Sequence, residues 1–203
     1  MSRVTHVEIL VEEESMEAAL REFLPRVLPP VTFEIYRHQG KGDLLKKLPS
    51  RLAAYRRWLP DNMRIIVLVD RDGEDCHELK ARLESIANTA RLNTRTVAGG
   101  DTYQIVNRIV IEELEAWYFG DWDAVRRAYP NVPTSVPRQA RFRDPDAIRG
   151  GTWEAFEKTL KGAGYFASGL RKIECARAIA PHWEVDRNRS RSFRAFVTAL
   201  TDF

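Results

Sequence analysis

The stretch RIIVLVD (residues 64–70) constrains the fold of this chain more than any other. It is a continuous apolar run, which is typical of a strand in a parallel sheet that is covered on both faces. The stretch DRDGED (70–75), which begins at its last residue, holds four carboxylates within six positions. So much negative charge at the end of a buried strand indicates a binding or catalytic role there. We expect Glu74 and Asp75 to differ from the other two by favouring the N-terminus of the next helix.

Strand-like and helical patterns alternate along the first 129 residues. The sequence predicts strands at 4–11, 31–37, 64–70, 94–98 and 104–111, and helices at about 16–27, 44–58 and 75–91. Parallel strands need a crossover connection, which is usually a helix. We therefore predict an α/β fold of Rossmann-like type, with a mainly parallel sheet flanked by helices.

The last third of the chain differs in character from this core. Residues 130–145 are rich in Pro and Arg and indicate an exposed connector, and helical patterns follow at about 152–161, 170–180 and 190–201. A chain of 203 residues is long enough for one sizeable domain or for one domain with an appendage. We predict a core at 1–129 and, at 130–203, a connector and a basic helical extension packed on that core.

Composition excludes several classes of protein. The chain has no apolar run of about 18 residues, so we expect no membrane span. Its start has no signal-peptide pattern, so we expect a cytoplasmic protein. Cys76 and Cys175 are far apart and have no CxxC or nearby His pair, which argues against a zinc site or a disulfide framework. We expect both to be small buried hydrophobic residues.

Acidic groups follow three of the predicted strands: VEEES (11–15), DRDGED (70–75) and IEELEAW (111–117). In an open parallel sheet the carboxyl ends of the strands meet at one edge, where ligands bind. In extended backbone Asp70 and Asp72 would point the same way, with Glu12 beside them and Glu113 or Glu115 opposite. Carboxylates in such a group repel one another, and Mg²⁺ or Mn²⁺ relieves that repulsion. The pattern predicts a site for one ion or two.

Each acidic group has a simpler explanation when it is taken alone. The paired aspartates could cap the next helix, Glu12 to Glu14 could favour a helix N-terminus, and ELE could be a solvated turn. Their convergence favours the metal site. An EF-hand does not fit, because Gly73 is fourth from Asp70 and position twelve is Ala81. GKGD (40–43) is no Walker loop, since it lacks the glycine spacing and the Lys-Ser/Thr ending.

Basic residues gather late in the chain, where residues 137–194 hold 13 Lys and Arg against 7 Asp and Glu. Arginine and serine side chains bind phosphate oxygens well, so this bias predicts a nucleic-acid partner. The candidates are Arg171, Arg177, Arg189, Arg191 and Arg194, with Ser190 and Ser192 among them. The alternative is that Asn188 or Ser190 caps the last helix and the arginines lie in water. We expect Trp117 to belong to the core.

Several of these motifs together resemble a known family. They are LVEEES, VLVDRDGEDC, IEELEAWYFGD, GLRKIECARAIAPHW and NRSRSFRAF, and they extend across nearly the whole chain. A Glu after the first strand and an apolar strand that ends in DxD look like the Toprim domain of topoisomerases, primases and overcoming-lysogenization-defect nucleases. The full set resembles the bacterial Toprim-like proteins of domain-of-unknown-function family 4276.

This resemblance implies a role for each matched residue. Glu12, Asp70 and Asp72 correspond to the conserved Glu and the paired aspartates, and Glu113 and Glu115 correspond to further metal ligands. A late lysine that stabilises charge at the scissile phosphate corresponds best to Lys172. Two positions depart from the pattern, since Glu13 replaces the usual Gly and Met16 replaces an acid that is sometimes found there. These departures affect whether the site can hold a second ion.

The residues and the resemblance lead to one main hypothesis, a Mg²⁺- or Mn²⁺-dependent nuclease that acts on DNA or RNA. Many members of the resembled family are encoded beside an ATPase of the ABC or structural-maintenance type, which implies a two-component anti-phage defence system. The alternative is a non-catalytic Toprim-like subunit that binds or regulates such an ATPase. A nucleotide-sugar transferase that uses DxD to hold a metal diphosphate would explain neither ELEAW nor the basic third.

Overall fold

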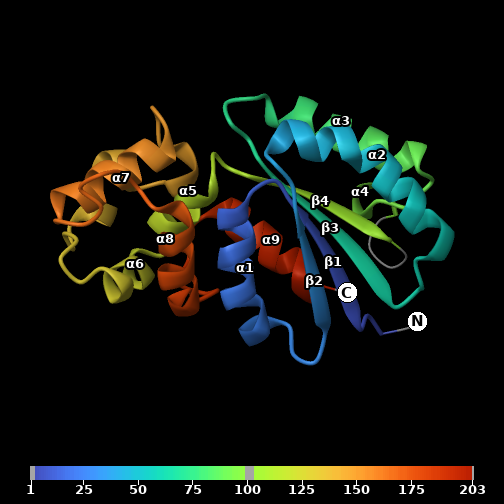
Figure 1. Ribbon diagram of the computed structural model, residues 1–203, viewed down its shortest axis with the longest axis horizontal. Coiled ribbons are helices and arrows are strands. Elements are labelled where there is room, and N and C mark those ends of the chain that lie inside the picture. The colour runs from blue at the N-terminus through green and yellow to red at the C-terminus, as the bar shows by residue number, and fades with distance from the viewer. Residues whose placement is uncertain (1–2, 99–102, 203) are drawn as a thin grey trace.

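The computed structural model describes residues 3–98 and 103–202 and contains a parallel sheet. Its strands are β1 (His6–Val11), β2 (Thr32–Arg37), β3 (Met63–Asp70) and β4 (Ile105–Val110). Within the described residues they form one four-stranded sheet of order β2-β1-β3-β4, and every neighbouring pair is parallel (Figure 1). The α/β class expected from the sequence is confirmed.

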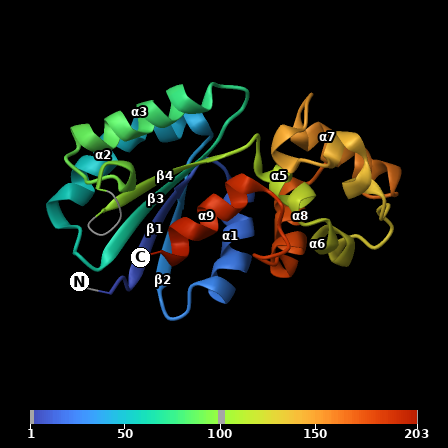
Figure 2. The ribbon, with the colours of Figure 1, turned by 180° about the vertical axis from the view of Figure 1, so that it is seen from behind.

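Helices cover both faces of this sheet. Helix α1 (Glu14–Val27) packs on one face, and α2 (Lys41–Trp58) and α3 (Cys76–Thr89) pack on the other (Figures 1 and 2). β2 and β3 lie on opposite sides of β1, so the β1–β2 and β2–β3 crossovers run in opposite directions. Right-handed crossovers then place their helices on opposite faces. The fold therefore has a topological switch point between the carboxyl ends of β1 and β3, where ligands bind in such sheets.

The strand predicted at 94–98 is wrong. Arg95–Ala98 forms the short helix α4, and only Thr94 makes a β-bridge, to Ile105. The carbonyl of Thr94 accepts the N–H groups of Val97 and Ala98, so the chain turns at this point. The β-branched pattern misled the prediction, because Thr94 is buried but Val97 is 71% exposed and, among the described residues, packs against no sheet.

A helical lobe, residues 114–182, lies beside the sheet (Figure 1). It contains α5 (Leu114–Gly120), α6 (Trp122–Ala128), three 3-10 helices (Val136–Arg138, Ala140–Phe142 and Pro145–Ala147), α7 (Thr152–Gly162), α8 (Lys172–Ile179) and a last 3-10 helix (Ala180–His182). The connector predicted at 130–145 is only partly exposed, because Val132, Val136 and Phe142 are buried in the core. After the lobe the chain returns to the sheet, where helix α9 (Arg191–Thr201) packs against β4.

Trp117 joins the lobe to the sheet and is a core residue, as predicted. Its side chain is fully buried, and its ring lies 5.3 Å from that of Phe196 on α9 and 5.9 Å from that of Trp183. Of the two cysteines, Cys175 is buried as expected, whereas Cys76 is only partly buried. No helix in the described part of the chain has the length and hydropathy needed to cross a membrane.

We expect Trp117→Ala to lower the free energy of unfolding by about 3–5 kcal/mol, because it removes a large buried ring from the contact between α5 and α9. Urea unfolding followed by circular dichroism measures this change. Trp58→Ala is the matched control, since Trp58 is 54% exposed and its removal should change stability by about 0.5 kcal/mol or less. Equal effects of the two substitutions would contradict the placement of Trp117.

Candidate metal centre

Glu12 and Asp70 lie side by side at the switch point of the sheet. Asp70 is the last residue of β3, and Glu12 directly follows the neighbouring strand β1. Both are buried, and the Glu12 carboxylate accepts a hydrogen bond from the backbone N–H of Asp70. The sequence predicts this pair, because parallel strands place their carboxyl ends at the same edge of the sheet.

Burial makes the charged forms of these two carboxylates unfavourable. Burial raises the pKa of Glu12 to about 7, although the hydrogen bond from the backbone of Asp70 acts in the opposite direction. Burial and then the charge of Glu12 raise the pKa of Asp70 well above its usual range, with smaller contributions from Glu13, Glu115 and Asp72. A bound cation favours the ionised form of nearby carboxylates, so this pair is suited to hold one.

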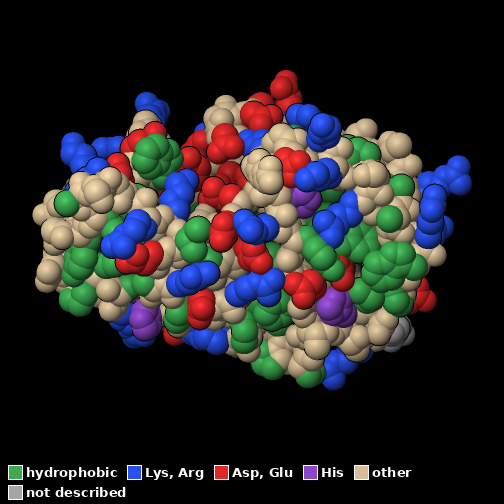
Figure 3. Space-filling model, in the orientation of Figure 1, with side chains coloured by type: hydrophobic (Ala, Val, Ile, Leu, Met, Phe, Trp, Pro, Cys, Tyr) green, Lys and Arg blue, Asp and Glu red, His purple; other side chains and the backbone are tan. Residues whose placement is uncertain are grey.

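Buried Glu115 and partly exposed Lys172 lie near this pair, and we call the four residues Glu12, Asp70, Glu115 and Lys172 the acidic centre. Glu115 lies on α5 and is 1% exposed, and burial raises its pKa to about 7 although the charge of Lys172 opposes this. Its Oε1 lies 3.8 Å from Nζ of Lys172, while its buried Oε2 has no hydrogen-bond partner among the described residues. Figure 3 shows acidic side chains gathered where the lobe meets the carboxyl edge of the sheet.

Lys172 is the first residue of α8 and reaches this group from the lobe. Burial would lower the pKa of Lys172, but the charges of nearby acids raise it above its usual range. These acids are Glu115, Glu13, Glu113 and Asp70. The ammonium also lies 5.7 Å from the ring centre of Trp153. The structure thus brings the predicted lysine to the predicted acids.

Asp72 is placed differently from the sequence expectation. Residues 70 and 72 do not share one side of an extended strand, because β3 ends at Asp70 and Asp72 has a positive φ of 48°. The next residue, Gly73, also has a positive φ, so the chain turns tightly here. The Asp72 side chain is 47% exposed, and its carboxylate lies 3.0 Å from Nζ of Lys41. The two-residue spacing of Asp70 and Asp72 does not indicate this turn.

Lys41 is a functional candidate that sequence reasoning missed. Its side chain is only 12% exposed, and Nζ lies 2.9–3.0 Å from Asp72, from Glu74 and from the carbonyl of Arg71. Burial would lower the pKa of Lys41, but these two carboxylates raise it. The available signal was GKGD, which opens α2 at the same carboxyl edge of the sheet. Glu74 therefore pairs with Lys41, while Asp75 caps α3 as predicted by accepting the N–H groups of His77 and Glu78.

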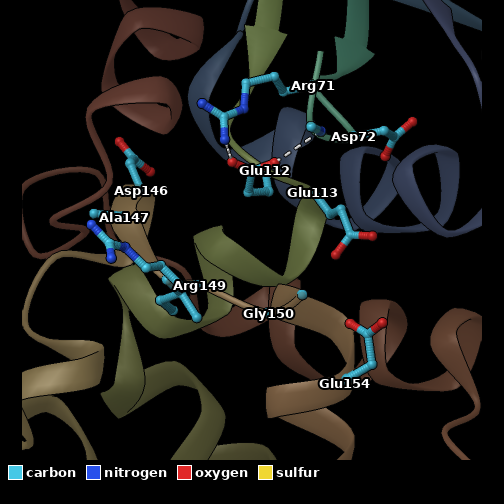
Figure 4. Close-up of a pocket in the computed structure, with 12 residues that line it drawn as sticks. Arg71, Asp72, Glu112, Glu113, Asp146, Ala147, Arg149, Gly150 and Glu154 are labelled. Carbon is cyan, nitrogen blue, oxygen red and sulfur yellow. Dashed lines mark hydrogen bonds and ion pairs between the residues drawn. The ribbon is translucent and has the colours of Figure 1, made fainter. Parts of the chain in front are cut away.

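Glu113 and its neighbour Glu112 are tied to other elements. The Glu113 carboxylate accepts hydrogen bonds from Thr152 Oγ1 (2.6 Å) and from the N–H of Trp153 (3.1 Å), at the start of α7. Glu112 pairs with Arg71 and accepts the N–H of Gly73 (Figure 4). Glu113 thus lies next to the acidic centre and also holds the lobe, a role that the sequence did not indicate.

The five predicted nucleic-acid arginines do not join the acidic centre as one group. Arg171 pairs with Glu174 and Arg191 with Asp144, Arg177 is exposed, Arg189 donates to the carbonyls of Phe119 and Arg143, and Arg194 donates to the carbonyl of Asn188. Ser190 caps α9 by accepting the N–H of Phe193, as the alternative predicted. Ser192 accepts the indole N–H of Trp117. The NRSRS motif therefore has a structural role.

The donors of the acidic centre fit a hard divalent cation. Among residues 3–98 and 103–202, no group of three or more His, Cys, Asp or Glu side chains is placed to hold a metal ion. The available atoms are nonetheless carboxylate oxygens, as Mg²⁺ and Mn²⁺ prefer, and Glu115 Oε2 is buried without a partner. Glu12 and Asp70 are the adjacent pair that could hold an ion, and Glu115, Asp72 and Glu113 would have to move closer to this pair to join them as ligands.

A comparison with known families identifies the chain. It matches the family described as "Domain of unknown function (DUF4276)" over residues 11–201, nearly its whole length, and therefore belongs to that family. The matched span includes every residue of the acidic centre. No curated protein and no solved structure matches the chain.

We expect Glu115→Gln to change how stability depends on pH. The folded chain holds a proton on Glu115 up to a pKa of about 7, whereas the usual value is 4.5, so the free energy of unfolding falls as pH rises between these values. The glutamine variant lacks this loss and should gain about 2–3 kcal/mol over the original chain between pH 4.5 and pH 8. Urea unfolding in the presence of a chelator measures it. The exposed Glu22→Gln is the control, and the same pH dependence in both variants would contradict the burial of this charge.

Proposed function

We propose that this member of the DUF4276 family is a metal-dependent nuclease of Toprim type, a hydrolase that cleaves phosphodiester bonds in nucleic acid with Mg²⁺ or Mn²⁺. The observation that carries the proposal is the acidic centre itself. Its three carboxylates come from separate segments and lie near the switch point, although burying them there is unfavourable. A stable core gains nothing from such a group, whereas a cation site needs it.

The chain's own residues have distinct roles in this proposal. Glu12, Asp70 and Asp72 hold the ion, and Glu113 and Glu115 complete the site or form a second one. A divalent cation bound there would activate water and stabilise negative charge on the phosphate. Lys172 faces the same group and would neutralise charge at the scissile phosphate. Lys41 supplies the counter-charge for Asp72 when no ion does.

We also propose a cytoplasmic setting and a partner. The resemblance of the sequence motifs to Toprim-like proteins supports an ATPase of the ABC or structural-maintenance type that works with this chain in a bacterial defence system. Cleavage would then be under the control of the ATPase.

A second candidate is a non-catalytic Toprim-like subunit that binds or regulates such an ATPase. It is favoured by the internal partners of two predicted ligands, since Glu12 accepts a backbone N–H and Asp72 pairs with Lys41. Glu13 and Met16, the two departures from the Toprim pattern, also favour it. Under this alternative the acids would hold the loops in place and would bind no ion.

We expect Asp70→Asn to lower the rate of oligonucleotide cleavage in Mn²⁺ by at least about 100-fold, because it weakens the central ligand while keeping its shape. Circular dichroism and the melting temperature check that the fold is intact. Asp75→Asn is the matched control from the same loop, since Asp75 only caps α3 and its loss should affect stability rather than cleavage. Equal cleavage by Asp70→Asn and the original chain would refute the assignment.

Titration calorimetry with Mn²⁺ separates the two candidates. A nuclease of this type should bind the ion, and Asp72→Ala should weaken the binding by roughly 10-fold or more, since the variant loses one carboxylate ligand. Asp43→Ala, on the first turn of α2 and paired with Lys47, serves as the control and should bind as the original chain does. No heat of specific binding with the original chain would favour the non-catalytic subunit.

A further inference from the structure

A cavity of about 700 Å³ opens beside the acidic centre. Its walls come from the loop after β3, the loop between β4 and α5, the segment 146–151 and the start of α7 (Figure 4). Asp72 and Glu113, the two outer members of the proposed metal site, both line it. A molecule held in this cavity would therefore lie next to the proposed site of hydrolysis.

The cavity lining favours a sugar–phosphate backbone over a base. All of its residues are described, and none of them is aromatic, so the cavity offers no ring on which a base could stack. Part of the wall is the glycine pair Gly150 and Gly151, whose positive φ angles of 77° and 82° turn the chain into α7. A Cβ placed on Gly150 would meet no atom within 4 Å, so the main chain is open to a ligand here.

Most acids of the cavity already have internal partners. Glu112 pairs with Arg71, and Glu113 binds the start of α7. Asp146 accepts the side-chain hydroxyl of Ser190 and the backbone N–H groups of Arg191 and Ser192. The ion pair offsets the charge of Glu112, whereas the hydrogen bonds orient the carboxylates of Glu113 and Asp146 without neutralising them. A phosphate in the cavity would meet these charges and that of Glu154, so it needs a cation beside it.

Arg149 is the cation that this arrangement leaves available. Of the two arginines in the lining, Arg71 is taken by Glu112, whereas Arg149 is exposed and has no acidic partner among the described residues. Figure 4 shows Arg149 on the other side of the cavity from Arg71 and Glu112. A guanidinium in this position can hold a phosphate through two parallel hydrogen bonds.

We propose that the cavity binds the backbone of a single nucleic-acid strand and that Arg149 binds one of its phosphates. The volume lies in the range of small-ligand sites, so it suits a few nucleotides of one strand rather than a duplex. Backbone contacts carry no sequence information, so binding is sequence-independent. This inference rests on the proposed nuclease function, and it assigns strand binding to Arg149 rather than to the five arginines predicted from the sequence.

Fluorescence anisotropy with a labelled single-stranded oligonucleotide tests the proposal, using the full chain with Asp70→Asn to prevent cleavage. In this background we expect Arg149→Ala to raise the Kd about 10-fold, since it removes one charge-assisted contact. It should also reduce the slope of log K against log salt by about 0.7. Arg138→Ala is the matched control, because Arg138 is an exposed arginine of the connector that precedes Arg149 and does not line the cavity.

Each outcome decides the matter. Equal Kd values and salt slopes for Arg149→Ala and Arg138→Ala overturn the role of Arg149, while cleavage by the original chain would still support the nuclease. Tighter binding of a duplex than of its single strand overturns the assigned substrate class. A strong preference among oligonucleotides of equal length overturns backbone binding. If the Asp70→Asn chain binds no oligonucleotide and the original chain cleaves none, both proposals fail together.

Discussion

The strongest constraint on this structure is a pair of buried carboxylates at the switch point of a parallel sheet. Glu12 and Asp70 stand on neighbouring strands because the crossovers on the two sides of β1 run in opposite directions. Like charges at such a position repel, and the surrounding elements balance them from two sides. Lys172 approaches from the lobe, and Lys41 approaches from α2 and holds the neighbouring loop. Lys172 thus adds one charged contact, to Glu115, within the lobe, which the aromatic core around Trp117 joins to the sheet.

The sequence was sufficient to predict the four strands of the sheet, together with one that does not form, and to place the main acids at its carboxyl edge. The run RIIVLVD identified a buried parallel strand, and the rule that carboxyl ends share one edge brought Glu12, Asp70 and Glu115 together. Both inferences rest on the pattern of apolar residues and on the alternation of strands and helices, and both patterns can be read along the sequence. The resemblance added Lys172, which no spacing rule could connect to Asp70, since about a hundred residues separate the two in the chain.

The rest of the site depends on loop geometry and on partners distant in sequence. Asp72 leaves the strand direction because the loop turns with a positive φ, and its partner Lys41 lies thirty-one residues earlier. The arginines of the last third were expected to bind phosphate, yet four of them bind carbonyls or acids of their own chain. Composition gives the number of charges but not their partners. The prediction of a short strand at 94–98 failed for the same reason, because a β-branched segment forms a strand only where other parts of the chain pack against it.

Asp146 gives the cavity and the last helix a shared residue. One side chain lines the cavity and also accepts the first N–H groups of α9, the helix that covers β4. Local opening of α9 would release this carboxylate and alter the wall beside the acidic centre. By linkage, a molecule that binds the closed wall more tightly than the open one would stabilise α9 against such opening. The C-terminal helix, which begins more than seventy residues after the nearest predicted metal ligand, would thereby be thermodynamically coupled to the occupancy of the cavity.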